Sequence, residues 1–173
     1  MNVQENFAYN KDLNSKLNFK YKTKFSGNVP FGDGLTTFSK YPLYMFDRIE
    51  WKDRHGFIID GADEMTKKGF PFTSMEIQTG YYIDIYNIHT DANHDDSSIT
   101  ARNSNMAQLA EYIKGISTGK AVLIFGDTNS LYTHKGDNFY DLIIKPCNLK
   151  DAWIEKVMES KIPEKGEWEK YRY

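Results

Sequence analysis

The sequence predicts a mixed α/β fold, and three consecutive segments carry that prediction. Residues 81–89 alternate in polarity as an extended strand does when its two faces meet different surroundings. Residues 101–116 have apolar side chains three or four positions apart, which is typical of an amphipathic helix. Residues 121–125 form a continuous apolar run, which favours a strand buried on both faces. A strand, a helix and a buried strand in this order indicate a mixed α/β architecture.

The length and composition are those of one globular domain without a broad charge of either sign. The 173 residues include 22 Lys and Arg and 24 Asp and Glu, so the formal net charge is −2 (22 − 24). We therefore expect residues 1–173 to form a single domain, and we expect no tight non-specific binding to nucleic acid. The single cysteine, Cys147, excludes an intrachain disulfide framework and a multi-thiolate metal site.

No segment of the sequence predicts a membrane span or a signal peptide. No apolar run approaches the roughly 20 residues that a spanning helix needs. The first ten residues contain an acid and amides where a signal peptide would have an apolar stretch. We expect a soluble chain, while the compartment and any protein partner stay open.

The first third of the chain is expected to hold a helix, a loop and a strand. Residues 2–9 are too short to form a complete strand. Apolar side chains in residues 7–21 have helix-like spacing, which predicts a helix there. Glycine, proline and asparagine predict a loop over 25–33, and residues 35–39 are rich in strand formers.

The remaining elements follow from the same patterns. Residues 44–51 and 70–79 favour strands, and residues 60–68 favour a surface loop between them. A polar loop is expected over 90–98. Residues 154–173 carry balanced opposite charges, which favour a solvated helix or a frayed tail.

Four places hold polar residues that packing does not require, and two of them follow strands. They are Gln4-Glu5, Asn87-Ile88-His89, Gly126-Asp127-Thr128-Asn129 and Asp151-Ala152-Trp153. Loops beyond the carboxyl ends of strands commonly form the ligand sites of α/β proteins. The second and third places are therefore candidates for a functional site.

Asp127 and Asn129 are spaced so that an extended chain would point both side chains to one side. A carboxylate and an amide that converge in this way suit a hard divalent ion and a phosphoryl oxygen. The alternative is a plain turn, because all four residue types of the Gly-Asp-Thr-Asn segment favour turns.

His89 and Glu5 each have a structural and a functional interpretation. His89 is a candidate general acid or a cationic contact to a phosphoryl oxygen, whereas a metal cluster with Asp91 and His94 lacks a recognisable zinc spacing. Glu5, taken alone, is an ordinary acid in the first turn of a helix.

The order of the segments resembles the endonuclease/exonuclease/phosphatase superfamily, which has the deoxyribonuclease I-like fold. The turn Ser39-Lys40-Tyr41-Pro42 and the strand end Asn87-Ile88-His89-Thr90 look most like the sphingomyelinase and inositol-phosphatase-like branches. The segments that carry the resemblance are Val3-Gln4-Glu5, Gly32-Asp33-Gly34-Leu35, Ser39-Lys40-Tyr41-Pro42-Leu43, Lys68-Gly69-Phe70, Asn87-Ile88-His89-Thr90, Ala101-Arg102 to Gln108-Leu109 and Gly126-Asp127-Thr128-Asn129.

The resemblance implies a four-layer α/β/β/α sandwich with two mixed sheets and a divalent-metal site at one end. It implies Mg²⁺, or Mn²⁺ in its place, bound by Glu5 and Asp127. Catalytic roles would fall to His89 at the scissile phosphate, Asp127 near the attacking water and Asn129 at the phosphoryl oxygens. The implied reaction is hydrolysis of a phosphoester in a nucleic acid, a phospholipid or an inositol phosphate.

Two family features have no counterpart in the sequence. The chain starts at the helix that follows the family's first strand, and no Asp-His dipeptide occurs anywhere. The resemblance is therefore to an internal, truncated stretch of the domain that lacks the first and last strands. A metal-dependent phosphoesterase is one interpretation, and a non-catalytic fragment that binds phosphate ligands is the alternative.

Overall fold

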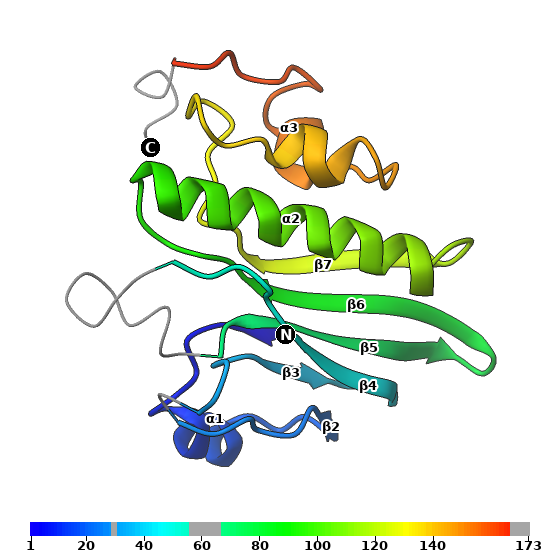
Figure 1. Cartoon of the computed structure of the whole chain (residues 1–173). Coiled ribbons are helices and arrows are strands. Elements are labelled where there is room, and N and C mark those ends of the chain that lie inside the picture. The colour runs from blue at the N-terminus through cyan, green and yellow to red at the C-terminus, as the bar shows by residue number, and fades with distance from the viewer. Residues whose placement is uncertain (29–30, 56–66, 167–173) are drawn as a thin grey trace.

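The computed structural model describes residues 1–28, 31–55 and 67–166, which form a mixed α/β arrangement with two sheets (Figure 1). The four-stranded sheet has the order β4-β5-β6-β7, in which β6 and β7 are parallel and the other pairs are antiparallel. The three-stranded sheet has the order β1-β3-β2 and is antiparallel throughout. The elements are β1 (Asn2–Val3), α1 (Asn10–Lys16), β2 (Tyr21–Lys22), β3 (Thr36–Ser39), β4 (Leu43–Glu50), β5 (Gly69–Gln78), β6 (Tyr81–His89), α2 (Asp96–Ile116), β7 (Ala121–Asp127), the π-helix η1 (Tyr140–Ile144) and α3 (Ala152–Lys156).

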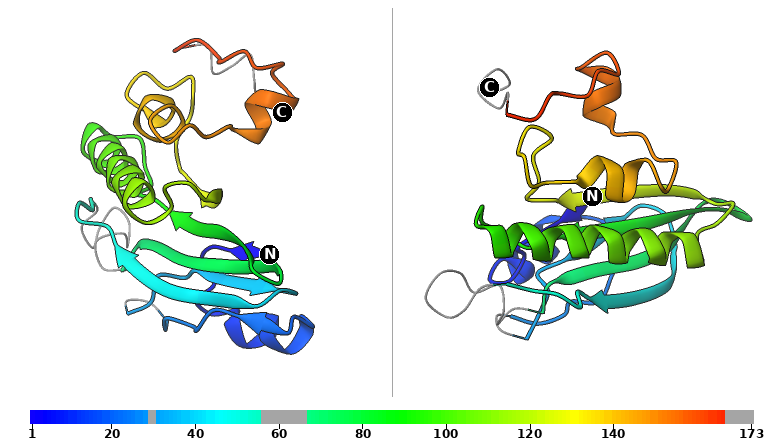
Figure 2. Two further views of the ribbon diagram at one scale, coloured as in Figure 1. Left: turned by 90° about the vertical axis from the view of Figure 1, so that its right-hand side faces the viewer. Right: turned by 45° about the horizontal axis from the view of Figure 1, so that its top comes forward.

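Helix α2 covers one face of the four-stranded sheet, and the three-stranded sheet lies on the opposite side (Figures 1 and 2). On the α2 side, Tyr86 and Ile88 of β6 pack with Met106 and Leu109, and all four are almost fully buried. Side chains alternate along a strand, so the residues between them face the other sheet. Asn87 accordingly donates hydrogen bonds to the carbonyls of Val3 and Thr36.

The strands and the long helix that periodicity predicted are present. The strand predicted over 81–89 is β6, and the apolar run at 121–125 forms the first five residues of β7. The prediction that this run is buried on both faces is wrong, because β7 lies at the edge of the sheet and its Leu123 and Phe125 are 42% and 43% exposed. The strands expected at 44–51 and 70–79 are each displaced by one residue. Helix α2 begins five residues before the predicted start, because Asp95 accepts hydrogen bonds from the backbone N–H groups of Ser97 and Ser98 and caps it.

The N-terminal prediction is wrong. A helix was expected over 7–21, but α1 covers seven residues and buries none of them, and two-residue strands lie on either side of it. These strands pair with β3 through contacts more than ten residues away in sequence. The expectation of two mixed sheets is also corrected, because the sheet that they form is wholly antiparallel.

The loop and tail predictions are met in part. Most of the surface loop expected at 60–68 lies outside the described residues, but Lys68 at its end is buried and not on the surface. In the C-terminal stretch, α3 ends at Lys156 and an irregular chain follows to residue 166, while residues 167–173 lie outside the described part. No helix within the described residues is long and apolar enough to cross a membrane.

Candidate active site

The ends of the parallel strands β6 and β7 bring two candidate residues together. His89 is the register partner of Asp127, so the two residues lie side by side on the same face of the sheet. Gly126 allows this close approach, because its φ is +148° and a Cβ there would lie 2.0 Å from the carbonyl oxygen of Ile88. The close approach of the two strands thus explains why a glycine precedes Asp127. As a result, the imidazole of His89 lies beside the carboxylate of Asp127 at the end of the two strands.

Glu5 approaches the same place from the other sheet. Its side chain is 74% exposed, and its Oε1 lies 4.0 Å from Nε2 of His89, whose side chain is 3% exposed. Glu5 follows β1 in a tight turn with φ +54°, in which its carbonyl accepts the N–H of Phe7. A positive φ at a residue other than glycine is a strained conformation, and such strain is concentrated at functional sites. Glu5 therefore lies in a constrained turn before the helix and not in a helical first turn.

Asn87 joins the segment that carries Glu5 to the strand that carries His89. The Nε2 atom of Gln4 donates to Oδ1 of Asn87, whose Nδ2 lies 3.2 Å from the carbonyl oxygen of Val3. Asn87 is fully buried between the sheets. Two of the polar segments singled out in the sequence are thus held together by direct hydrogen bonds.

Asn129 does not have the expected extended geometry. Its φ is +46°, and its backbone N–H donates to Oδ1 of Asp127 at 2.9 Å. This is the turn that aspartate and asparagine favour by bonding the neighbouring backbone. The side chain of Asn129 reaches the loop after β6, where its Nδ2 lies 3.2 Å from the carbonyl oxygen of Thr90. Asp127 and Asn129 are brought together by a turn, and the prediction of an extended pair is corrected.

Buried polar side chains that the residue patterns did not single out support the backbone at His89. The indole Nε1 of Trp51 donates to the carbonyl oxygen of His89 at 2.7 Å, and Nζ of buried Lys68 donates to that of Thr90 at 3.2 Å. Thr90 also donates its backbone N–H to the carbonyl oxygen of Asp127 at 3.1 Å. The available signal for Lys68 was its place in the Lys68-Gly69 pair at the start of β5, although the composition of the preceding stretch is typical of a surface loop.

The fourth polar segment has a structural role. Asp151 caps α3, with its Oδ1 accepting the backbone N–H groups of Trp153 and Ile154. Its other oxygen accepts the hydroxyl of Tyr132 at 3.0 Å. Burial, followed by the nearby Asp151 carboxylate, raises the pKa of Tyr132. These contacts account for Asp151 without a catalytic role.

Comparison with known proteins identifies the family. The family described as Endonuclease/Exonuclease/phosphatase family 2 matches the chain over residues 40–163, which include both strand ends at the site. The chain belongs to this family. The family resemblance noted in the sequence is therefore confirmed.

The curated and solved relatives of this family member include sphingomyelinases. A protein named sphingomyelinase from Mycobacterium bovis is 33% identical over 162 residues, which cover 89% of this chain and 31% of that protein. A protein of the same name from Mycobacterium tuberculosis matches equally well. The chain thus spans about a third of the length of these curated relatives.

Solved structures share the fold over part of their length. Sphingomyelinase C from Streptomyces griseocarneus aligns with a TM-score of 0.70 at 19% identity, covering 87% of this chain and 57% of that one. Beta toxin from Staphylococcus aureus, a double mutant with bound magnesium ions, aligns with a TM-score of 0.66 at 23% identity over the same shares of both chains. At these identities the likeness shows the fold.

Glu5 and Asp127 supply the carboxylate oxygens that a hard divalent cation prefers. Glu5 and Asp127 present exposed carboxylates beside buried His89. Mg²⁺ is commonly bound by one or two carboxylates and keeps several waters, so it does not need a complete protein cage. Within the described residues, no group of three or more His, Cys, Asp or Glu is placed to hold a metal, and the cluster of His89, Asp91 and His94 is not formed.

Proposed function

We propose that the chain is a Mg²⁺-dependent phosphodiesterase whose site is the junction of Glu5, His89 and Asp127. The observation that carries the proposal is the registered pair of His89 and Asp127 at parallel strand ends, with Glu5 Oε1 4.0 Å from the imidazole. The four-layer sandwich expected of the family would form the rigid frame for these groups. Membership of a phosphoesterase family supports the reaction class.

In the proposed reaction, water attacks phosphorus and the bond between phosphorus and the leaving alcohol oxygen breaks. Asp127 accepts a proton from the attacking water, and protonated His89 delivers one to the leaving oxygen. Asn129 uses an amide N–H to orient a phosphoryl oxygen. Mg²⁺, held by Glu5 and Asp127, would supply positive charge that stabilises the charge developing on the phosphoryl group.

We further propose a choline phospholipid of the sphingomyelin type as the substrate. Support comes from the relatives named sphingomyelinase at 33% identity. The near-neutral net charge of −2 gives no broad basic surface for a nucleic-acid backbone. Hydrolysis of sphingomyelin vesicles, compared with single-stranded DNA and an inositol phosphate, distinguishes the three substrate classes.

The test of the reaction is release of p-nitrophenol from bis-p-nitrophenyl phosphate with Mg²⁺ and with EDTA. We expect metal-dependent release that Asp127→Asn lowers by about 10²-fold or more, because a positioned proton acceptor contributes about 10² to 10⁴. The matched control is Asp141→Asn, which changes an exposed aspartate on η1 away from the strand ends. Equal activity in both variants would remove Asp127 from the site.

The second candidate is phosphate-ligand binding without turnover. It is favoured by the hydrogen bonds that the proposed groups already make within the loops, since Oδ1 of Asp127 accepts the backbone N–H of Asn129 and Nδ2 of Asn129 donates to the carbonyl oxygen of Thr90. Calorimetry with phosphocholine and Mg²⁺ tests it. This candidate is favoured over the enzyme if two results are found together. Asp127→Asn must weaken binding of phosphocholine, and the unchanged protein must hydrolyse neither bis-p-nitrophenyl phosphate nor sphingomyelin.

A further inference from the structure

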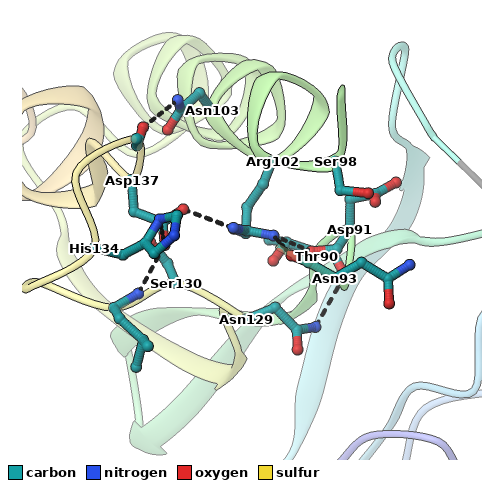
Figure 3. A network of polar contacts seen from close by, with 12 residues as sticks. Thr90, Asp91, Asn93, Ser98, Arg102, Asn103, Asn129, Ser130, His134 and Asp137 are labelled. Atoms are coloured by element: carbon teal, nitrogen blue, oxygen red, sulfur yellow. Dashed lines mark hydrogen bonds and ion pairs between the residues drawn. The ribbon is translucent and has the colours of Figure 1, made fainter. Parts of the chain in front are cut away.

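A fully buried ion pair lies behind the strand ends. Arg102 of α2 has a side chain 1% exposed, and its Nη2 lies 2.8 Å from Oδ1 of Asp137, whose side chain is 0% exposed. The Nε atom of Arg102 donates to the same oxygen at 2.9 Å (Figure 3). Neither residue contacts the proposed reacting groups directly in the hydrogen bonds of the described chain.

The remaining contacts of this pair reach the two loops that leave the site. The Nη1 atom of Arg102 donates to the carbonyl oxygens of Asp91 at 3.2 Å and Asn93 at 2.8 Å, in the loop that follows β6. The second oxygen of Asp137 accepts the backbone N–H of Leu131 at 3.1 Å and lies 3.5 Å from Nδ1 of His134, both in the loop that follows β7. This ion pair therefore links both loops to α2, as the convergence of side chains in Figure 3 shows. Two further α2 side chains contribute, since Asn105 accepts the backbone N–H of Asp91 and Asn103 bonds the backbone of Gly136 and Asn138.

The two loops are also hydrogen-bonded to each other at the site. Thr90 accepts from Nδ2 of Asn129 through its carbonyl, and its hydroxyl donates to the carbonyl oxygen of Thr128. A displacement of either loop must therefore move the Asn129 amide relative to His89. The pair of Arg102 and Asp137 fixes the loops on the side away from the reacting groups.

Burying two charges is costly, and the attraction between them need not repay that cost as stability. An apolar pair of similar volume would often serve stability as well. A guanidinium instead fixes the relative positions of the carbonyl and carboxylate groups that accept its hydrogen bonds, because its N–H groups form a rigid planar fork. This chemistry suits a device that sets the positions of two loops.

We infer that Arg102 and Asp137 are a positioning pair that couples the loops after β6 and β7 and thereby sets the His89, Asp127 and Asn129 geometry. The inference rests on the proposed function, since it concerns positioning for that reaction. A displacement of about 1 Å at a reacting group can cost about 10²-fold in rate. The pair should accordingly affect turnover more than substrate binding.

The test uses Arg102→Lys and Asp137→Asn in the full chain, assayed well below each variant's melting temperature with bis-p-nitrophenyl phosphate and Mg²⁺. We expect kcat to fall by about 10 to 100-fold while KM changes by less than about threefold. The double variant should fall little further than either single variant, because the two residues act as one unit.

The matched control is Asp84→Asn, which alters another fully buried carboxylate on β6, five residues before His89. Asp84 accepts hydrogen bonds from Ser74 and Ser117 and pairs with Lys120 at 3.2 Å. Its loss should lower the melting temperature and leave kcat within about twofold. An unchanged kcat in folded Asp137→Asn, or an equal loss of kcat in Asp84→Asn, would overturn the inference.

Amide hydrogen exchange separates this inference from the proposed function. Arg102→Lys should speed exchange of the Leu131 amide in the loop after β7, although that amide is bonded by Asp137 and not by Arg102. Asp137→Asn should likewise speed exchange of the Thr90 amide in the loop after β6, which is bonded by the carbonyl of Asp127. If the unchanged protein hydrolyses no phosphodiester, the proposed function fails and exchange alone judges the pair. Faster exchange across the loops then supports coupling, and unchanged exchange overturns it.

Discussion

His89 combines burial with a position at the mouth of the proposed site. Its backbone carbonyl accepts the indole N–H of Trp51, which fixes the end of β6, and its ring faces Glu5. We predict that His89→Gln lowers kcat by about 10² to 10⁴-fold and leaves KM within a fewfold, because proton delivery matters in the transition state and not in binding. Steady-state kinetics with bis-p-nitrophenyl phosphate measure both constants.

The control for that change is His55→Gln, since the side chain of His55 is half exposed and its Nε2 lies 3.6 Å from the capping carboxylate of Asp95. This variant should keep the parental kcat. A raised KM with normal kcat in His89→Gln would instead assign His89 to substrate binding.

The positions of the candidate site residues were partly predictable at this scale. His89 and Asp127 could be placed at strand ends, because each closes a segment with a clear strand pattern. The positive φ of Asn129 and the burial of Lys68 could not, because both depend on the neighbouring loop after β6. Arg102 is similar: on a helix pattern it is one charged residue among several, and only the folded loops show that it is enclosed.

At the scale of elements, α2 depends on a charged cap. Hydrogen bonds from the Ser98 hydroxyl and then the Ser98 backbone N–H lower the pKa of Asp95 to about 2, below its ordinary 3.8. A depressed carboxyl pKa in the folded state stabilises the fold above the ordinary value, and that stabilisation is lost as pH falls through the folded value. We predict that the melting-temperature advantage of the parent over Asp95→Ser shrinks between about pH 4 and pH 2, as thermal unfolding monitored by circular dichroism would show.

Asp95→Asn is the companion variant, because asparagine caps well and does not titrate in this range. The advantage of the parent over it should shrink over the same interval. A difference that stays constant from pH 5 to pH 2 would contradict the assigned role of the Asp95 charge.

The elements also show where periodicity fails as a guide. The bounds of β6 were predicted to the residue, because nine consecutive residues alternate between a face that packs on α2 and a face that meets the three-stranded sheet. β1 and β2 have two residues each and exist only through pairing with β3, so their sequences carry no period. The apolar spacing over 7–21 therefore suggested a helix, although α1 buries none of its residues.

At the scale of the whole molecule, the two sheets meet through polar as well as apolar contacts. Leu35 and Phe38 from the segment of the three-stranded sheet are buried, as is Ile85 of β6. Among them Asn87 is fully enclosed and bonded to the carbonyls of Val3 and Thr36. This amide links β6 to both β1 and β3. It thus joins two sheets that, within the described residues, share no backbone hydrogen-bond ladder.

We predict that Asn87→Leu lowers the free energy of unfolding by about 2 to 4 kcal/mol, because it leaves buried carbonyls and the Gln4 amide without their partner. Urea denaturation followed by tryptophan fluorescence measures the change. Asn14→Leu on α1 is the control, since its side chain bonds only Asn10 and Lys22 among the described contacts, and it should cost less than about 1 kcal/mol. Equal costs would mean that the inter-sheet amide contributes no more than a surface one, and that apolar packing alone holds the two sheets together.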